Sequence, residues 1–457
     1  MAHSYQAIDS HRSVHFSLVK RMLLTAATLT LVLLVSWVVP HLQTADTSPY
    51  ERIFPLSTKT PYAMSGLAHE RPPDPDDDWS TCSLVQINAV YRHGTRYPMR
   101  REYAKMHSTL LDLQTRYMGS IPPWLQAYTF GYPEESSELL APAGRLEMEG
   151  LGRRARALAD QYNLTSKYSR EAFVFEHTRV QRTLESATAF ADSYFADTAP
   201  NVTFMCRPQG QDITLRFFDN CPKYKAWVRK STNMTIQTKA FEESSRAIAM
   251  VGRLRDAGLH LPSGAALTWQ ELNAIYTACA YDVALFNQSR TWCSLFSTQD
   301  LLLLDFYSDL KKFYQCGPGF NISVAIAAPL LSDMLATIKA SHLTGYFRFA
   351  HAETVLPLAC LLGLCLSPSP LTASWTETEI NGRHFKVSGL SPFAGNLAFH
   401  VYTCGGNARD RGDVRIKVLV NEVEVPLPFC NGYCTVEDLE VHFQTALRFD
   451  FKAECEL

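Results

Sequence analysis

The sequence predicts an α/β protein: a three-layer sandwich around a central mixed sheet, with an inserted, mostly helical cap domain and one N-terminal transmembrane helix before it. Three observations support this prediction. Strand-like runs occur near both ends of the folded part, a helix-rich block separates them, and an uncharged apolar run precedes both. With 457 residues and 46% hydrophobic content, the chain is long enough for one large core or two interleaved cores.

Runs rich in β-branched and aromatic residues predict the strands. They lie at 84–91 (LVQINAVY), 173–178 (FVFEHT), 346–350 (YFRFA), 385–390, 397–403 and 414–427. The last range resembles a hairpin around Asn421 and Glu422. Helical periodicity continues from 178 through Phe190 and also appears near 144–161, 238–257, 269–286 and 298–315. The last of these helices opens with Ser297 and Asp300 in capping-box spacing.

These patterns divide the chain into five regions. We expect a cytoplasmic tail (1–21), a transmembrane signal-anchor (22–39), a stem (40–52), an α/β domain formed by 53–195 and 320–457, and a helical cap domain (196–319).

The apolar run at 22–39 has about the minimum length for a membrane-spanning helix. Lys20 and Arg21 precede it, whereas the first charges after it are Asp46 and Glu51, so the positive-inside rule places the N-terminus in the cytosol. The expected product is a single-pass type II membrane protein whose folded part faces the secretory-pathway lumen or the cell exterior. The alternative is a cleaved signal peptide and a secreted or lumenal protein.

Composition gives no indication of nucleic-acid binding and indicates an oxidising compartment. The net charge is −2 and no long Lys/Arg block occurs, so nothing predicts nucleic-acid binding. Twelve cysteines suit an oxidising compartment, and none of them has the spacing of a zinc site. Candidate N-glycosylation sequons occur at Asn163, Asn201, Asn233, Asn287 and Asn321.

The strongest motif is Arg92-His93-Gly94-Thr95-Arg96-Tyr97-Pro98, directly after the predicted strand 84–91. Ligands of α/β sheets bind beyond the carboxyl ends of strands, and Gly94 would let the backbone approach an oxyanion without a Cβ in the way. Arginine presents fork-shaped donors that match phosphate oxygens, and a neutral imidazole can attack phosphorus. The motif therefore predicts a phosphate site with His93 as a nucleophile.

Two further motifs also follow predicted strands. His351-Ala352-Glu353 supplies a donor to phosphate and a carboxylic acid that can protonate a leaving oxygen. Thr178–Ala187 places Arg182 in the first turns of a helix, near backbone N–H groups that attract anions. Three strand ends with phosphate-compatible side chains predict one shared site.

Together, RHGTRYP, the T-x-x-x-R-T-x-x-S-A pattern at 178–187 and HAE resemble the histidine acid phosphatases of branch 2 of the histidine phosphatase superfamily, and among them the multiple inositol polyphosphate phosphatases. Other matching segments are STKTPY (57–62), WCSLF (292–296) with the following DLLLLDFYSDLKKFY, AHAETVLPL (350–358), SPFAGNLAF (391–399) and VLVNEVEVPLPFC (418–430). The resemblance covers about residues 52–455.

The resemblance implies a phosphomonoesterase that hydrolyses inositol polyphosphates, such as inositol hexakisphosphate, through a covalent phosphohistidine. His93 is then the nucleophile and Glu353 the proton donor, while phosphate is held by Arg92, Arg96, Arg182 and His351. No metal or other cofactor is implied. The HAE form, in place of the His-Asp dipeptide of most phytases, indicates the inositol polyphosphate branch. The resemblance also implies the disulfides Cys82–Cys404, Cys279–Cys293 and Cys430–Cys434.

Basic residues after the first motif, Arg100, Arg101 and Lys105, are candidate contacts for the non-reacting phosphates; the alternative is a solvated helix face. Lys223, Lys225, Arg229 and Lys230 are weaker candidates. Two other functions stay open. The same phosphate-holding side chains would bind any accessible phosphomonoester, as in a broad-specificity histidine acid phosphatase or a bisphosphoglycerate phosphatase. A non-catalytic binding protein on the same scaffold is the more distant alternative.

Overall fold

A computed structural model describes residues 55–65, 79–340, 342–365, 367, 369–405, 413–430 and 432–457. The predicted cytoplasmic tail, transmembrane helix and stem lie outside these residues. Within the described part, the segment Asn321–Ala340 is long and apolar enough to cross a membrane by composition. Because 56% of its apolar window is buried inside the protein, it has the environment of a core helix.

A seven-stranded mixed sheet forms the centre of the α/β part, in the order β3-β2-β4-β1-β5-β6-β7. The strands are β1 (Cys82–Arg92), β2 (Phe173–His177), β3 (Phe204–Met205), β4 (Gly345–Ala350), β5 (Asn396–Cys404), β6 (Asp413–Val420) and β7 (Val423–Glu424). β1, β2, β3 and β4 run parallel, whereas β5 is antiparallel to β1 and to β6. The predicted α/β class with a mixed sheet is therefore confirmed.

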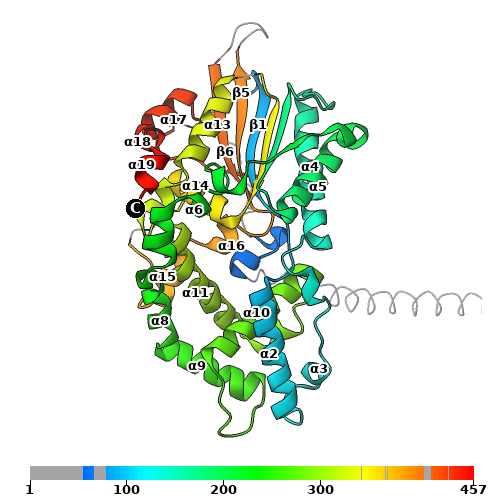
Figure 1. Ribbon diagram of the computed structural model, residues 1–457, viewed down its shortest axis with the longest axis vertical. Helices are drawn as coiled ribbons and strands as arrows, with labels where there is room; N and C mark the ends of the chain where they lie inside the picture. The colour runs from blue at the N-terminus through cyan, green and yellow to red at the C-terminus, as the bar shows by residue number, and fades with distance from the viewer. Residues whose placement is uncertain are drawn as a thin grey trace, which may run out of the picture. The chain divides into compact units, whose positions relative to one another are not determined.

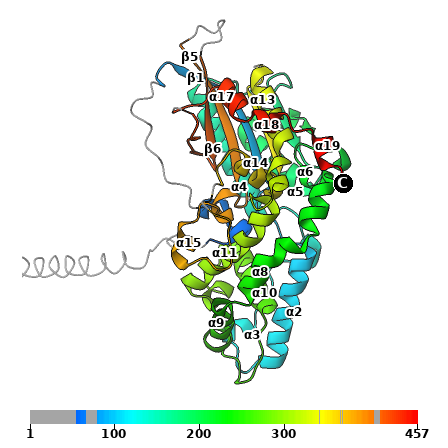
Figure 2. The ribbon, with the colours of Figure 1, turned by 90° about the vertical axis from the view of Figure 1, so that its left-hand side faces the viewer.

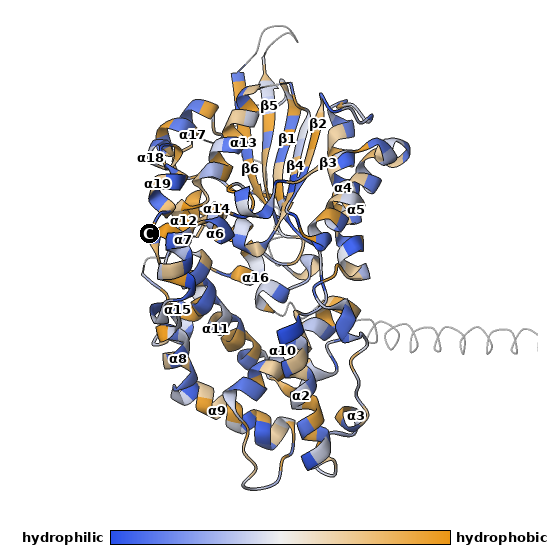
Figure 3. Ribbon diagram, in the orientation of Figure 1, coloured by the Kyte–Doolittle hydropathy of each residue, from blue (hydrophilic) through white to orange (hydrophobic). Residues whose placement is uncertain are grey.

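Helices cover both faces of the sheet (Figure 1). α4 (Pro142–Gln161) and α5 (Gln181–Phe195) lie on one face, and α13 (Ala328–Ala340) and α14 (Ala352–Leu361) on the other. Alternation along β1 explains the two layers: Ile87 and Ala89 belong to the core under α5, and Val90 belongs to the core on the opposite face. Hydrophobic residues dominate the strands in Figure 3.

The helices between residues 236 and 316 form a block below the sheet. Its longer members are α8 (Ile236–Glu242), α9 (Ser245–Arg253), α10 (Trp269–Phe286) and α11 (Thr298–Cys316). α2 (Arg100–Tyr117), which precedes β2 in the sequence, packs beside α10 in the same block, as the two perpendicular views agree (Figures 1 and 2). The predicted helices at 269–286 and 298–315 are confirmed, and the Ser297 side chain accepts a hydrogen bond from the Asp300 N–H.

Two elements differ from the sequence prediction. The predicted helix at 238–257 divides into α8 and α9, because Ser244 caps α9 and its side chain accepts a hydrogen bond from the Ala247 N–H. The predicted strand at 385–390 is wrong: Val387–Leu390 is one helical turn, α16, whose first N–H donates to Asp309 on α11 at 3.0 Å. By contrast, the hairpin is confirmed, with Asn421 and Glu422 at φ of 49° and 69° between β6 and β7.

The described residues contain five disulfides, two of which join distant parts of the chain. The three predicted pairs, Cys82–Cys404, Cys279–Cys293 and Cys430–Cys434, are confirmed. Two more join Cys221 to Cys455 and Cys360 to Cys365. The two remaining cysteines are Cys206, which is exposed, and Cys316, which is buried.

Candidate active site

The ends of three parallel strands bring the three motifs together. His93, directly after β1, donates its N–H to the Ala350 carbonyl at the end of β4, at 3.0 Å. Thr178, directly after β2, donates its N–H to the Phe349 carbonyl at 3.1 Å. The residues that follow β1, β2 and β4 therefore meet at one edge of the sheet, as expected for ligand sites in α/β folds.

His93 is buried, with 3% of its surface exposed, and its ring is fixed by one contact. Nδ1 lies 2.8 Å from the Gly94 carbonyl oxygen. Since a carbonyl only accepts, Nδ1 carries the proton and Nε2 keeps its lone pair. Burial and the nearby charges of Arg182 and Arg92 hold the pKa of His93 well below its usual value. The imidazole is thus neutral, the state that a nucleophile requires.

The loop after β1 is clamped against α4. A Cβ on Gly94 would approach backbone atoms of Gly144 to under 3.0 Å, and a Cβ on Gly144 would meet the backbone of Thr95 equally closely. Gly94 is therefore needed for contact with α4, and the expectation that it also lets the backbone approach an oxyanion stays a prediction. Glu147 of α4 completes the clamp, since its carboxylate accepts hydrogen bonds from the Thr95 N–H at 2.7 Å and from the Thr95 hydroxyl at 3.1 Å.

Three arginines surround His93, and they differ in how many of their N–H donors are already hydrogen-bonded. Arg92 is buried and donates through Nη1 to the carbonyls of Thr58 and Ser391. Burial lowers its pKa to about 9, and burial with the charge of Arg96 lowers that of Arg182 to about 10, so both are charged at neutral pH. The Nε atoms of Arg92 and Arg182 are buried and have no hydrogen-bond partner among the described residues. Phosphate oxygens are the acceptors that such donors lack.

Arg96 is held by α2 and α10. Its Nη1 donates to the Tyr281 hydroxyl at 2.9 Å and lies 3.6 Å from the Glu102 carboxylate. Burial opposes its charge, but Tyr281 and Glu102 outweigh burial and raise the pKa of Arg96. The Glu102 carboxylate also binds Lys59 at 3.1 Å.

His351 is buried beside His93, with the two ring centroids 5.7 Å apart. Its Nε2 lies 2.9 Å from the Thr178 hydroxyl, which joins the motif after β4 to the motif after β2. Burial and the charge of Arg182 lower the pKa of His351 well below its usual value.

Glu353 lies in the first turn of α14 and forms an ion pair that its sequence context does not reveal. Its Oε1 is 2.8 Å from Nζ of Lys312 on α11. Burial opposes ionisation of Glu353, but the charge and the hydrogen bond of Lys312 outweigh burial and hold its pKa well below the usual range. In this structure the expected proton donor is therefore a carboxylate.

These groups line a cavity of about 660 Å³, to which α10 and α11 of the helical block also contribute residues. The cationic residues that line it are Lys59, Arg92, Arg96, Arg101, Lys105, Arg182, Arg229, Lys311 and Lys312. Its acidic residues are Glu102 and Glu353. Nine cations against two carboxylates indicate a ligand with several negative charges, because each Arg or Lys near a phosphate is worth a few kcal/mol before desolvation.

The structure brings together His93, Glu353, Arg92, Arg96, Arg182 and His351, and adds Arg101 and Lys105 from one face of α2. Arg100 is exposed and does not line the cavity, because neighbouring residues of a helix face different directions. Of the weaker candidates in the cap, Arg229 lines the cavity and the other three do not.

Sequence reasoning missed the roles of Lys59, Lys311, Lys312 and Glu147. The first three lie inside STKTPY and DLKKFY, two segments that carry the family resemblance. That resemblance was the only available signal, since a Lys pair on a helix usually marks a solvated face. Among the described residues, no group of three or more His, Cys, Asp or Glu side chains is placed to hold a metal ion.

Comparison with known proteins agrees with this geometry. The chain is 28% identical to multiple inositol polyphosphate phosphatase 1 of Gallus gallus, covering 90% of this chain and 91% of that protein. It is 26% identical to the Homo sapiens protein of the same name, covering 84% of each.

Solved structures share the fold. The phytase from D. castellii superposes with a TM-score of 0.74 at 17% identity, over 88% of this chain and 87% of the phytase. The Bifidobacterium longum multiple inositol polyphosphate phosphatase in complex with inositol hexasulfate gives a TM-score of 0.66 at 19% identity, over 87% and 98%. The family model described as histidine phosphatase superfamily (branch 2) matches residues 83–421, most of the chain, so this protein belongs to that superfamily, as its motifs predicted.

Proposed function

We propose that this protein is a phosphoric monoester hydrolase that removes phosphate from inositol polyphosphates, such as inositol hexakisphosphate, through a phosphohistidine intermediate. The observation that carries the proposal is His93: among the described residues its Nε2 has no hydrogen-bond partner, and it lines a cavity with nine Lys and Arg residues. The similarity to proteins named multiple inositol polyphosphate phosphatase supports the substrate class.

In the proposed reaction, Nε2 of His93 attacks phosphorus while Arg92, Arg96 and Arg182 hold the phosphoryl oxygens. The P–O bond to the inositol breaks, and the leaving oxygen takes the proton of the protonated Glu353 carboxyl. Water then attacks the phosphohistidine, with the Glu353 carboxylate accepting a proton from it. Inorganic phosphate leaves, and both side chains return to their starting states.

The test uses the purified chain in the presence of EDTA. Inositol hexakisphosphate, a phosphoglycerate and 4-nitrophenyl phosphate are supplied separately, and phosphate release is followed. We expect release to be fastest from inositol hexakisphosphate and expect EDTA to leave it unchanged. A strong preference for the phosphoglycerate would favour the bisphosphoglycerate alternative, and equal rates would favour a broad acid phosphatase.

We expect His93→Ala to abolish turnover on every substrate, because the variant lacks the imidazole nitrogen that attacks phosphorus in the proposed reaction. Acid quenching of the parent protein during turnover should trap an acid-labile phosphoenzyme that the variant lacks. Label on a serine or cysteine, or substantial activity in the variant, would refute the assignment of His93. Binding of inositol hexakisphosphate without turnover in the parent would instead favour the binding-protein alternative.

We also propose that the folded part faces the secretory lumen or the cell exterior, anchored through 22–39. Five disulfides support an oxidising compartment, and all five sequon asparagines are exposed. Enzymatic removal of N-glycans should lower the apparent mass of the protein from eukaryotic cells. Protease should digest the folded part only after the vesicle membrane is opened.

A further inference from the structure

The ion pair between Lys312 and Glu353 poses a chemical problem for the proposed reaction. An inositol alkoxide is a poor leaving group, so Glu353 must donate a proton and must first carry one. With Nζ of Lys312 at 2.8 Å, the carboxyl group is held in its ionised form. Something must therefore separate the ammonium from the carboxylate before the P–O bond breaks.

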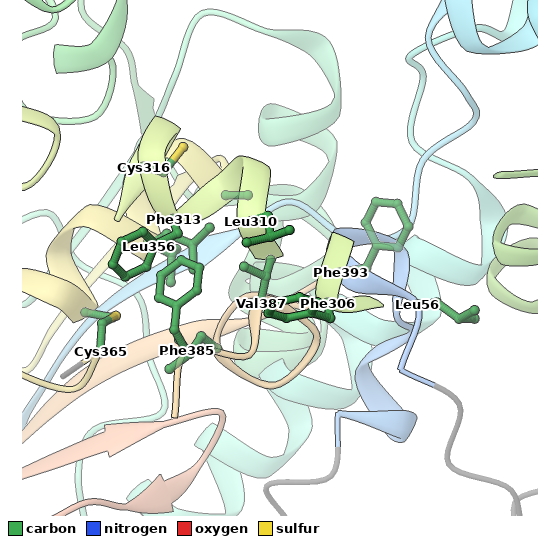
Figure 4. Close-up of a cluster of buried hydrophobic side chains, with 14 of the residues drawn as sticks. Leu56, Phe306, Leu310, Phe313, Cys316, Leu356, Cys365, Phe385, Val387 and Phe393 are labelled. Carbon is green, nitrogen blue, oxygen red and sulfur yellow. The ribbon is translucent and has the colours of Figure 1, made fainter. Parts of the chain in front are cut away.

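Both residues are fixed by their helices. Leu310 and Phe313, which flank Lys312 on α11, belong to one buried cluster with Leu356 of α14 and Phe385 (Figure 4). Arg383 binds Asp305 and Asp309 of α11 at 2.6 Å each, deep in the protein. Because this packing holds α11 against α14, rotation of the long Lys312 side chain is the movement that can separate the two charges.

Several other titratable groups on the surrounding elements lie close enough to interact electrostatically with Glu353. They are Cys316 of α11, His351 at the N-cap of α14, Arg92 at the end of β1, Arg182 of α5 and Tyr224 of α7 (Pro222–Tyr224). Among the described residues, only Lys312 forms an ion pair with Glu353. Lys312 also lines the cavity, so a ligand can reach it.

We propose that Lys312 ties proton donation by Glu353 to a second phosphate on the substrate: the neighbouring phosphate draws the ammonium away, and Glu353 then takes up a proton from solvent. The geometry favours this because the leaving oxygen must lie within hydrogen-bond reach of Glu353, and the next phosphate of an inositol polyphosphate is on the adjacent ring carbon. That phosphate carries more charge than one carboxylate and offers more acceptor oxygens, so it competes well for Lys312. Its charge also favours the protonated form of Glu353.

This inference rests on the proposed function and adds a determinant of specificity. A substrate with one phosphate leaves the ion pair closed and Glu353 ionised, and it is cleaved slowly unless its leaving group departs without a proton. In a densely phosphorylated substrate, a second phosphate draws Lys312 away, and Glu353 can then be protonated and donate its proton. Discrimination thus arises at the chemical step as well as in binding.

The experiment measures kcat/KM against pH for Lys312→Met with inositol hexakisphosphate and with an inositol monophosphate. Without the ammonium, burial is opposed only by the more distant charges of Arg92 and Arg182 and by His351, so the pKa of Glu353 should rise and the alkaline limb of the monophosphate profile should move upward. A shift of one pH unit means about tenfold more protonated Glu353, and about tenfold faster monophosphate hydrolysis, at a pH above the limb. The preference for inositol hexakisphosphate over the monophosphate should fall by at least the same factor.

Lys311→Met is the matched control. It also removes one cation from the cavity wall, but Lys311 makes no ion pair with Glu353. This variant should raise KM for inositol hexakisphosphate and leave the alkaline limb of the monophosphate profile in place. Lys312→Arg keeps the cation and should keep both the limb and the preference.

Phosphoenzyme formation from 4-nitrophenyl phosphate distinguishes failure of the proposed function from failure of the proposed role of Lys312, because nitrophenolate departs without a proton. If the parent forms no phosphoenzyme, the proposed function itself is wrong. If Lys312→Met forms it normally but its alkaline limb does not move, only the role of Lys312 is wrong. Equal loss on all three substrates would show that Lys312 merely supports the structure, and this too would overturn the inference.

Discussion

The chemistry of this phosphatase depends on which protons its side chains hold. His93 receives a fixed tautomer from a single backbone carbonyl, that of Gly94, and its neutrality from burial among arginines. In the proposed reaction Glu353, two residues beyond His351 in the chain, must hold a proton although it lies beside an ammonium. The proposed nucleophile therefore has the required protonation state in the free enzyme, whereas the proposed acid does not.

Glu353→Gln tests the acid directly. The substitution keeps the size of the side chain but removes the transferable proton, and loss of a general acid typically slows a reaction by about 10²–10⁴-fold. We expect a loss of this order on inositol hexakisphosphate and a much smaller loss on 4-nitrophenyl phosphate, whose leaving group needs no proton. Steady-state kcat on the two substrates provides the measurement.

His93→Ala is the reference for this comparison, because removal of the nucleophile should harm both reactions alike. If Glu353→Gln instead lowered both rates equally with substrate binding unchanged, Glu353 would have a positioning role at the start of α14. The proton donor would then have to be another group of the cavity.

At the scale of elements, the contact between the β1 loop and α4 decides where His93 lies. The backbone of Gly94 and Thr95 touches the backbone of Gly144 without any side chain between them, and Glu147 one turn later accepts from Thr95. A helix that approaches so closely acts as a rigid support for the loop.

Gly144→Ala should therefore disturb the site more than an ordinary helix substitution. Its Cβ would meet backbone atoms of Thr95 at under 3.0 Å, and such overpacking costs about 1–3 kcal/mol of stability. Since α4 and the loop must separate, we expect activity to fall together with the free energy of unfolding. Gly150→Ala is the control on the same helix: its Cβ would meet only the flexible end of Arg154 at 3.1 Å. It should change the free energy of unfolding far less than Gly144→Ala, because the helix-propensity gain of about 0.5–1 kcal/mol offsets a shift of the Arg154 side chain, which binds Glu422, and activity should be retained. Equal effects of the two variants would contradict the importance of the contact between the β1 loop and α4.

The elements also show what the sequence was able to predict. Strands such as 84–91 are marked by their own residues, and the motifs that follow them locate the phosphate site without any tertiary information. The turn at Val387 was mistaken for a strand because Asp309, 78 residues away, accepts its N–H and fixes a helical conformation. Lys312 was missed for the same reason, since only packing of α11 against α14 places it beside Glu353. Local patterns do not encode such long-range pairs.

At the scale of the whole molecule, the cavity needs the sheet and the helical block to hold a fixed distance, because each contributes cations to it. The chain passes from the sheet to the helical block and back to the sheet. Each of these two parts contains a disulfide. Cys82–Cys404 joins neighbouring strands across a separation of 322 residues, whereas Cys279–Cys293 closes a separation of 14 within the block.

Removing these two bridges should therefore have unequal effects. In the chain-entropy account, a bridge that closes about 15 residues contributes roughly 3 kcal/mol, and one that closes several hundred contributes roughly 5 kcal/mol or more. The Cys221–Cys455 bridge shortens the path between Cys82 and Cys404, but that path stays far longer than 14 residues. We expect the double variant Cys82→Ser/Cys404→Ser to lose more unfolding free energy than Cys279→Ser/Cys293→Ser, measured by denaturant unfolding without reductant. If the short bridge proved the more costly to remove, local packing around α10, and not restriction of the unfolded chain, would be the main contribution of these disulfides.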